Sequence, residues 1–251
     1  MPLTCPVCPT RVASFGRGIR NRVGLLATGG VIASLGVINV VKHVSPSAGV
    51  GIGVGAAAAL LLAARAVGLS WEQLGLSRER IRAGLLWGGG AIVAVGAVYL
   101  GGLLLPATRA AFLDVRYQIG VSDALKTAFV VIPLSTVLLE EVAFRSVLWG
   151  MLKRHMGTTR VVLVTSSLFG LWHILPALDF ASARGMGEGS AGPAATAAVV
   201  IGTVAFTAAG GAVAGELRRR SGSVIASAGL HWATNALGVL FGLVAWHIVS
   251  R

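Results

Sequence analysis

The chain is a succession of apolar runs, each long enough to cross a lipid bilayer. A helix of about 20 apolar residues spans the hydrocarbon core. The runs lie at roughly residues 23–41, 48–67, 83–105, 122–152, 160–178, 194–216 and 222–249. Backbone polar groups in lipid must be satisfied within their own segment, so each run is expected to be helical. We therefore predict an all-α, polytopic transmembrane helical bundle of seven or eight helices, depending on whether residues 222–249 form one helix or two.

The charges separate two sides of this bundle. Only 12% of the residues are charged, and the net charge is +12, whereas soluble domains carry about 25% charged residues. Thirteen basic residues precede the first run or follow the second, fourth and sixth runs, and five lie in the other connections. This is the positive-inside pattern of membrane proteins. It predicts an integral membrane protein with a cytoplasmic N-terminus, and it argues against a nucleic-acid partner.

We distinguish three parts of the chain: a basic cytoplasmic tail at 1–22, N-terminal transmembrane helices at 23–121, and a catalytic core at 122–249, whose bounds are those of the resemblance described below. The linker 68–82 is expected at the membrane interface. Ser70 and Gln73 have the spacing of a capping box, and Trp71 is a candidate interfacial anchor.

Small residues suggest where helices approach each other closely. The chain holds 35 glycines, which is about twice the usual share of ~7%. About half of this excess is attributable to composition alone. Pairs four residues apart fit close helix packing. They are Gly51/Gly55, Gly84/Gly88 and Gly211/Gly215.

The two cysteines, Cys5 and Cys8, lack further metal-ligand partners at the required spacing. The tail is therefore expected to be reduced and unstructured, and we expect no cofactor and no bound metal.

Two adjacent glutamates in the fourth run require an explanation. Glu140 and Glu141 lie in VLLEEVAFRSVL, and a carboxylate at the bilayer centre is unfavourable by roughly 2.5–3.5 kcal/mol. Glu141 and Arg145 are four residues apart with the acid first, which favours an ion pair. Glu140 is turned about 100° away. It is therefore expected to project into a cavity.

Other polar residues lie at the same depth. Glu140 precedes the basic Lys153 by thirteen residues, and His173 follows Arg160 by thirteen. At about 1.5 Å per residue, both lie roughly 20 Å from the same boundary. His231 and Asn235, four residues apart on the last run, bracket that depth. The sequence therefore predicts one site that combines Glu140, His173, His231 and Asn235.

This constellation suits acid–base chemistry. A carboxylate beside an imidazole can move a proton to and from water, and an imidazole with an amide can donate hydrogen bonds to an oxyanion. Phe144 and Phe169 are expected to wall the site. Each polar residue taken alone is also explained by helix packing or by a structural ion pair. A Glu/His/His metal site stays open, although no H-E-x-x-H motif supports it.

Three motifs carry a resemblance to a known family. They are Glu140-Glu141-x-x-x-Arg145, Phe169-x-x-x-His173 and His231-x-x-x-Asn235. They resemble the motifs of the CPBP family, which comprises CAAX prenyl proteases of the Rce1 type and related bacterial Abi-domain proteins. The resemblance implies an intramembrane glutamic protease in which Glu140 is the base and His173 orients the water. It also implies that His231 and Asn235 form the oxyanion hole, with Glu141 and Arg145 in support.

The expected activity is hydrolysis of a peptide bond in a membrane-anchored peptide or protein, prenylated in the CAAX-type case. The expected surroundings are the lipid bilayer, in a bacterial plasma membrane. Two alternatives remain open at this point: a membrane scaffold without proteolysis, and a proton-coupled transporter, since intramembrane Glu and His residues also relay protons.

Overall fold

Seven helical segments of the described chain are long and apolar enough to cross a membrane, which confirms the predicted polytopic bundle. The computed structural model describes residues 10–183 and 192–250, with side chains from residue 24 onward. Cys5 and Cys8 lie outside the described residues. The spans are Gly24–Val44, Pro46–Ala66, Arg78–Leu104, Val121–Leu152, Thr158–Ala183, Gly192–Ser221 and Val224–Val249. The last stretch is therefore one span rather than two.

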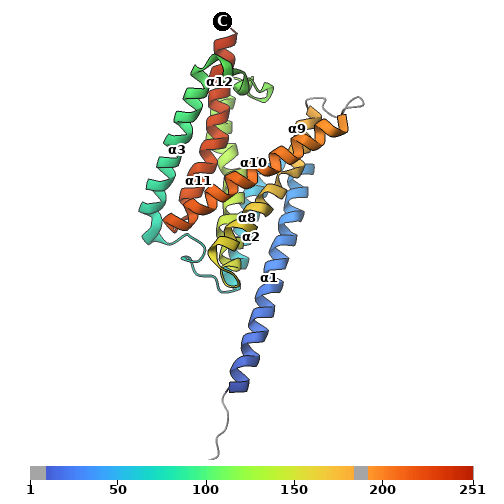
Figure 1. The fold of residues 1–251 in the computed structure, drawn as a ribbon, viewed down its shortest axis with the longest axis vertical. Helices are drawn as coiled ribbons and strands as arrows, with labels where there is room; N and C mark the ends of the chain where they lie inside the picture. Colours follow the sequence, from blue (N-terminus) through green and yellow to red (C-terminus); the bar gives the residue numbers. More distant parts are fainter. Residues whose placement is uncertain (1–9, 184–191, 251) are drawn as a thin grey trace, which may run out of the picture.

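Figure 1 shows the arrangement of the long helices. The fourth and seventh spans also contain π-helical stretches, η5 and η6 in the fourth and η7 in the seventh. The elements are α1 (Thr10–Val44), α2 (Gly49–Ala66), α3 (Ile81–Leu104), α5 (Val121–Lys126), η5 (Thr127–Val137), α6 (Leu138–Glu140), η6 (Glu141–Leu148), α7 (Trp149–Leu152), α8 (Thr158–Trp172), α9 (Ile174–Ala183), α10 (Gly192–Ser221), α11 (Val224–Trp232), η7 (Ala233–Leu237) and α12 (Gly238–Val249). Helix α1 begins at Thr10, so it extends into the stretch that the sequence assigned to the tail.

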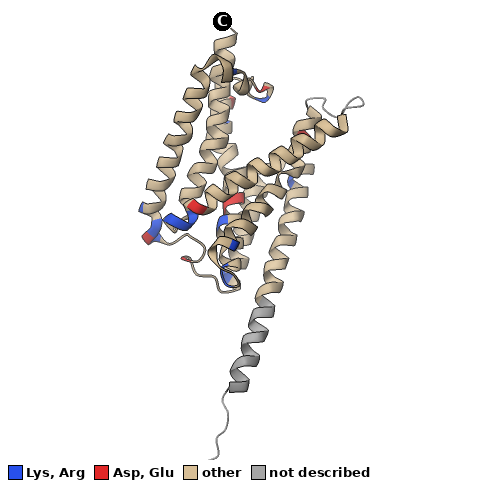
Figure 2. Cartoon of the chain, viewed as in Figure 1, with Lys and Arg blue, Asp and Glu red and all other residues tan. Residues whose placement is uncertain are grey.

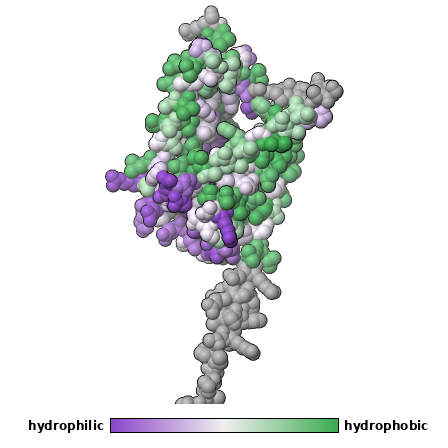
Figure 3. Space-filling model, viewed as in Figure 1, coloured by the Kyte–Doolittle hydropathy of each residue, from purple (hydrophilic) through white to green (hydrophobic). Residues whose placement is uncertain are grey.

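The charged residues gather mainly at one end of the bundle, where α3 begins and α10 ends (Figure 2). Apolar side chains cover most of the rest of the visible face (Figure 3). This is the distribution that a helical protein needs when a hydrocarbon layer surrounds its middle. The described chain thus forms an integral membrane protein.

The fourth span is irregular because Pro133 lies inside it. In the i→i+5 pattern of a π-helix, the carbonyl of Ala128 would bond to the nitrogen of residue 133, which proline leaves without a hydrogen. The indole Nε1 of Trp232 donates to this carbonyl instead, at 2.9 Å. The bond ties the fourth span to α11 beside His231.

The fifth span breaks at His173, where α8 ends and α9 begins. Pro176 cannot donate to the carbonyl of Trp172, four residues earlier. The side-chain amide of Asn39, on α1, donates to that carbonyl at 2.9 Å. A proline therefore bends the chain at a motif histidine, and α1 satisfies the freed carbonyl.

The linker after α2 is packed more deeply than the sequence suggested. Ser70 and Gln73 do form reciprocal capping hydrogen bonds, at 2.9 and 3.1 Å, and Trp71 is half exposed. Leu69 and Leu74, however, are completely buried in the bundle. The linker is therefore a packed turn beneath the fourth span, because its two leucines find apolar partners there.

Two of the three predicted glycine pairs lie at helix contacts. Gly88 faces Gly229 of α11, and Gly211 lies against Phe169 and Ser166. The prediction for Gly51 and Gly55 is wrong, since nothing within 4 Å would meet a side chain at either position. On that helix the close approach occurs at Gly53, which lies against the backbone of Leu134 and Ser135.

We predict that Gly53→Ala destabilises the bundle, because its methyl group would overlap the backbone of η5. Overpacking of this kind is unfavourable by about 1–3 kcal/mol. A thermal unfolding assay of the protein in detergent should give a lower Tm for Gly53→Ala and an unchanged or slightly higher Tm for the matched control Gly51→Ala. Equal Tm values for the two variants would contradict this packing.

Candidate active site

Both motif glutamates are buried: Glu140 is 3% exposed and Glu141 2%. Glu141 has two cationic or hydrogen-bonding partners on a single oxygen. Its Oε1 lies 3.2 Å from Nη1 of Arg145 and 2.9 Å from Nδ1 of His231. The predicted pair of Glu141 and Arg145 is therefore confirmed, and His231 joins it from α11. Arg145 is itself only 2% exposed, so each charge in this cluster depends on the others for its stabilisation.

Glu140 faces the two motif histidines. Its Oε2 lies 3.6 Å from Nε2 of His231 and 4.0 Å from Nε2 of His173. Its Oε1 accepts a hydrogen bond of 3.0 Å from Nε1 of Trp172. Oε2 itself receives no hydrogen bond from any residue in the described ranges. The predicted convergence of Glu140, His173 and His231 at one depth is thus confirmed.

The hydrogen bonds determine which imidazole nitrogens are free. Nδ1 of His173 lies 2.8 Å from the carbonyl of Phe169, and a carbonyl can only accept, so Nδ1 carries the hydrogen. By the same reasoning Nδ1 of His231 donates to the Glu141 carboxylate. In neutral imidazoles each Nε2 then holds a lone pair. Two such lone pairs and Glu140 Oε2 face one another, and a donor such as water is needed to link them.

A cavity of about 180 Å³ adjoins this cluster. His173, His231 and Asn235 all line it, which confirms that His231 and Asn235 point at the same space. Glu141 lines it as well, whereas Glu140 is not among the lining residues. The expectation that Glu140 projects into the cavity needs correction: Glu140 lies behind the two imidazoles, because Trp172 draws its carboxylate toward α8.

The two motif phenylalanines occupy different positions. Phe169 lines the cavity, with its ring centroid 4.7 Å from that of His173 and 5.7 Å from that of His231. The guanidinium of Arg145 lies over the same ring at 4.0 Å. The ring centroid of Phe144 lies 5.3 Å from that of Phe169, and Phe144 is fully buried. Phe169 therefore walls the site as expected, while Phe144 supports that wall from the core.

Other helices complete the cavity. Tyr99 of α3 lines it and donates a hydrogen bond of 2.9 Å to the carbonyl of Thr234. From α10, Phe206 and Gly210 line it, and both are exposed at the surface of the sixth span. The cavity is therefore bounded on one side by the junction of α3 and α10.

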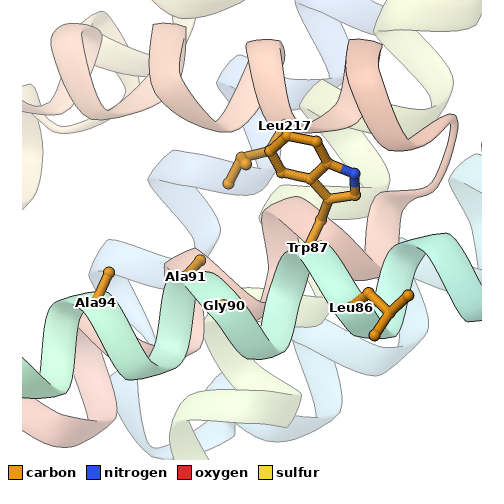
Figure 4. A pocket seen from close by; sticks show the side chains of 6 residues that line it. All are labelled: Leu86, Trp87, Gly90, Ala91, Ala94 and Leu217. Atoms are coloured by element: carbon orange, nitrogen blue, oxygen red, sulfur yellow. The ribbon is translucent and has the colours of Figure 1, made fainter.

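A second, apolar cavity of about 400 Å³ lies along the same junction. Figure 4 shows the indole of Trp87 standing between the helices beside Leu217, with Ala91 and Ala94 on the same face of α3. No titratable side chain lines it. The α3–α10 face is thus hollowed at two levels, one of which holds the polar cluster.

The polar cluster can carry out acid–base chemistry on a small molecule such as water. It joins a carboxylate oxygen without a hydrogen-bond donor to two imidazoles and an amide. Within the described ranges, no group of three or more His, Cys, Asp or Glu side chains has the arrangement that holds a metal ion. Fold and site together define a polytopic membrane protein with an intramembrane Glu/His/Asn centre.

Residues 123–237, a little under half of the chain, match the family model described as Rce1-like, type II CAAX prenyl endopeptidase. This segment contains all the motif residues named above, and the match confirms the resemblance to that family. No curated protein and no solved structure matches the chain.

Besides Phe206, sequence reasoning missed three aromatic residues at the site. Trp172 binds Glu140, Trp232 ties α11 to η5, and Tyr99 lines the cavity. Trp172 and Trp232 flank His173 and His231 directly in the sequence, and an indole beside a motif histidine was a readable signal. No sequence signal pointed to Tyr99, because it lies on a helix outside the three motifs.

We predict that Trp172→Phe lowers activity per folded molecule, since it removes the donor to Glu140 Oε1 and leaves both oxygens of a buried carboxylate without hydrogen bonds. Loss of such a partner is unfavourable by about 1–3 kcal/mol. The matched control is Trp246→Phe, which loses an indole bond to the carbonyl of Asp114 far from the motif residues. Cleavage rates normalised to monodisperse protein should fall for Trp172→Phe alone, and an equal loss in both variants would argue against a role at the site.

Proposed function

We propose that this chain is an intramembrane endopeptidase that hydrolyses a peptide bond in a membrane-anchored substrate with water activated by Glu140 and His173. The observation that carries the proposal is the position of Glu140 Oε2, which lies 3.6 and 4.0 Å from two imidazole nitrogens and receives no hydrogen bond from the described residues. A water molecule that donates to such acceptors is polarised for attack. The family match supports proteolysis as the reaction.

In the proposed first step, the water oxygen attacks the carbonyl carbon of the scissile peptide, and Glu140 takes one of its protons. His173 holds the water through Nε2, because its Nδ1 is engaged by the Phe169 carbonyl. The carbonyl oxygen becomes the oxyanion of a tetrahedral intermediate. General acid–base help of this kind accelerates a reaction by about 10²–10⁴-fold.

Asn235 and His231 are the proposed oxyanion donors. The side-chain amide of Asn235 can donate directly. His231 can donate from Nε2 only as an imidazolium, since Nδ1 already donates to Glu141. The carboxylate of Glu141, 2.9 Å from Nδ1, would balance that charge. In the last step Glu140 returns the proton to the amide nitrogen, the C–N bond breaks as the oxyanion re-forms the carbonyl, and a carboxylic acid and an amine are released.

The substrate is proposed to reach the site from the lipid. Phe206 and Gly210 are exposed and line the site cavity, and the second cavity continues along the junction of α3 and α10. A peptide anchored in the bilayer, of the CAAX type or a bacterial peptide under maturation, would approach along this face. Residues 122–249 would then be the catalytic core, with the preceding helices supplying α3 as one wall.

We expect Glu140→Gln to reduce kcat by about 10²–10⁴-fold, because the amide cannot accept the proton from water. Purified protein in nanodiscs and a membrane-anchored reporter peptide provide the measurement. Glu79→Gln, an exposed acid outside the site, is the matched control and should keep full activity. Activity that survived both Glu140→Gln and His173→Ala would contradict the mechanism. A cellular phenotype rescued equally by wild type and Glu140→Ala would favour a scaffold.

We expect Asn235→Ala to lower kcat by about 10²–10³-fold with little change in KM, as is typical for loss of one oxyanion donor. Thr234→Ala, one position earlier, is the control, because the Thr234 hydroxyl is bonded to the carbonyl of His231 rather than free to donate. Chelators should leave wild-type activity unchanged. A larger effect on KM than on kcat would assign Asn235 to substrate binding instead.

A further inference from the structure

Three consecutive arginines end α10, and they differ sharply in their surroundings. Arg219 and Arg220 are exposed, and both bind the carboxylate of Glu216. Arg218 is 5% exposed, and within the described ranges no carboxylate lies at ion-pair distance from it. A buried guanidinium without an acid is energetically unfavourable unless its donors are satisfied. Its position therefore requires a structural reason beyond the positive-inside pattern.

The donors of Arg218 go to two backbone carbonyls from different parts of the chain. Nε donates to the carbonyl of Arg145 at 3.1 Å, and Nη2 donates to the carbonyl of Gln73 at 3.2 Å. The ring of Trp149 lies 5.8 Å from the guanidinium carbon. Gly75, at φ +73°, leaves the space that the guanidinium fills. Arg218 thus joins the buried linker to the motif helix.

The Arg145 carbonyl lies in the π-helical stretch η6, which holds Glu141 at its first position. The side chain of Arg145 binds Glu141 and covers Phe169. A shift of this backbone would therefore move the guanidinium that fixes Glu141, and Glu141 in turn orients His231. Wide turns of this type occur frequently at functional sites.

We propose that Arg218 is a positioning residue, which holds η6 in register for catalysis by binding the Arg145 carbonyl on one side and the linker on the other. The proposal rests on the proposed proteolytic function for its kinetic consequences. Its structural consequence, the rigidity of residues 141–148, does not depend on that function.

The test compares Arg218→Gln and Arg218→Lys with Arg219→Gln, which removes the same charge from the same end of α10. Misplacement by about 1 Å can reduce a rate by about 10²-fold, so Arg218→Gln should lose at least about tenfold in kcat with KM within about twofold. Arg218→Lys should recover only part of the loss. The ammonium group keeps the positive charge, but it cannot reach both carbonyls as the planar guanidinium does. Arg219→Gln should retain wild-type kcat.

Hydrogen exchange of the amides of residues 141–148 is measured on the same proteins. Faster exchange in Arg218→Lys than in Arg219→Gln supports the proposal even where wild type cleaves no reporter, so failure of the proposed function is recognised separately. Should Arg218→Gln not fold, Arg218→Lys decides alone. Folded Arg218→Lys with wild-type kcat and wild-type exchange would overturn the proposal, as would an equal loss in Arg219→Gln.

Discussion

The burial of two adjacent carboxylates is the constraint on which the rest of this bundle depends. An unpaired carboxylate inside an apolar bundle is unfavourable, so each of the two needs partners from other parts of the chain. Arg145 and His231 share one oxygen of Glu141, and Trp172 binds one oxygen of Glu140. The other oxygen of Glu140 faces the two histidines and receives no hydrogen bond from the described residues. This oxygen can therefore accept a hydrogen bond from a reacting molecule such as water.

Irregular backbone is a second feature of the bundle, and it recurs beside each motif. Side chains from other helices donate to the carbonyls of Ala128, Arg145 and Trp172, and the donors are Trp232, Arg218 and Asn39. In lipid such carbonyls have no water to bind, so each departure from a regular helix requires a specific donor elsewhere in the chain. The donors bring the first, sixth and seventh spans into fixed contact with the two helices that carry Glu140 and His173.

Much of this arrangement was predictable because the membrane simplifies the problem. Charged boundaries fix the depth of a residue, and helical spacing fixes its face, so the convergence of Glu140, His173 and His231 followed from counting residues. The predictions were wrong where contacts between distant parts of the chain determine a residue's surroundings. Gly51 and Gly55 have the right spacing but face open surroundings, while Gly53 makes the close contact. Arg218 counted as a boundary charge in the sequence, but it is buried beneath the linker.

The sequence by itself determined the class of fold, the positions of the apolar runs and the identity of the motif residues, because these depend on local length, charge and period. Only the tertiary structure decided which carboxylate adjoins the cavity and which lies behind the imidazoles. That choice depends on Trp172 and on the break of the fifth span at His173, where Pro176 and Asn39 meet. Such contacts join residues far apart in the chain, and no local pattern encodes them.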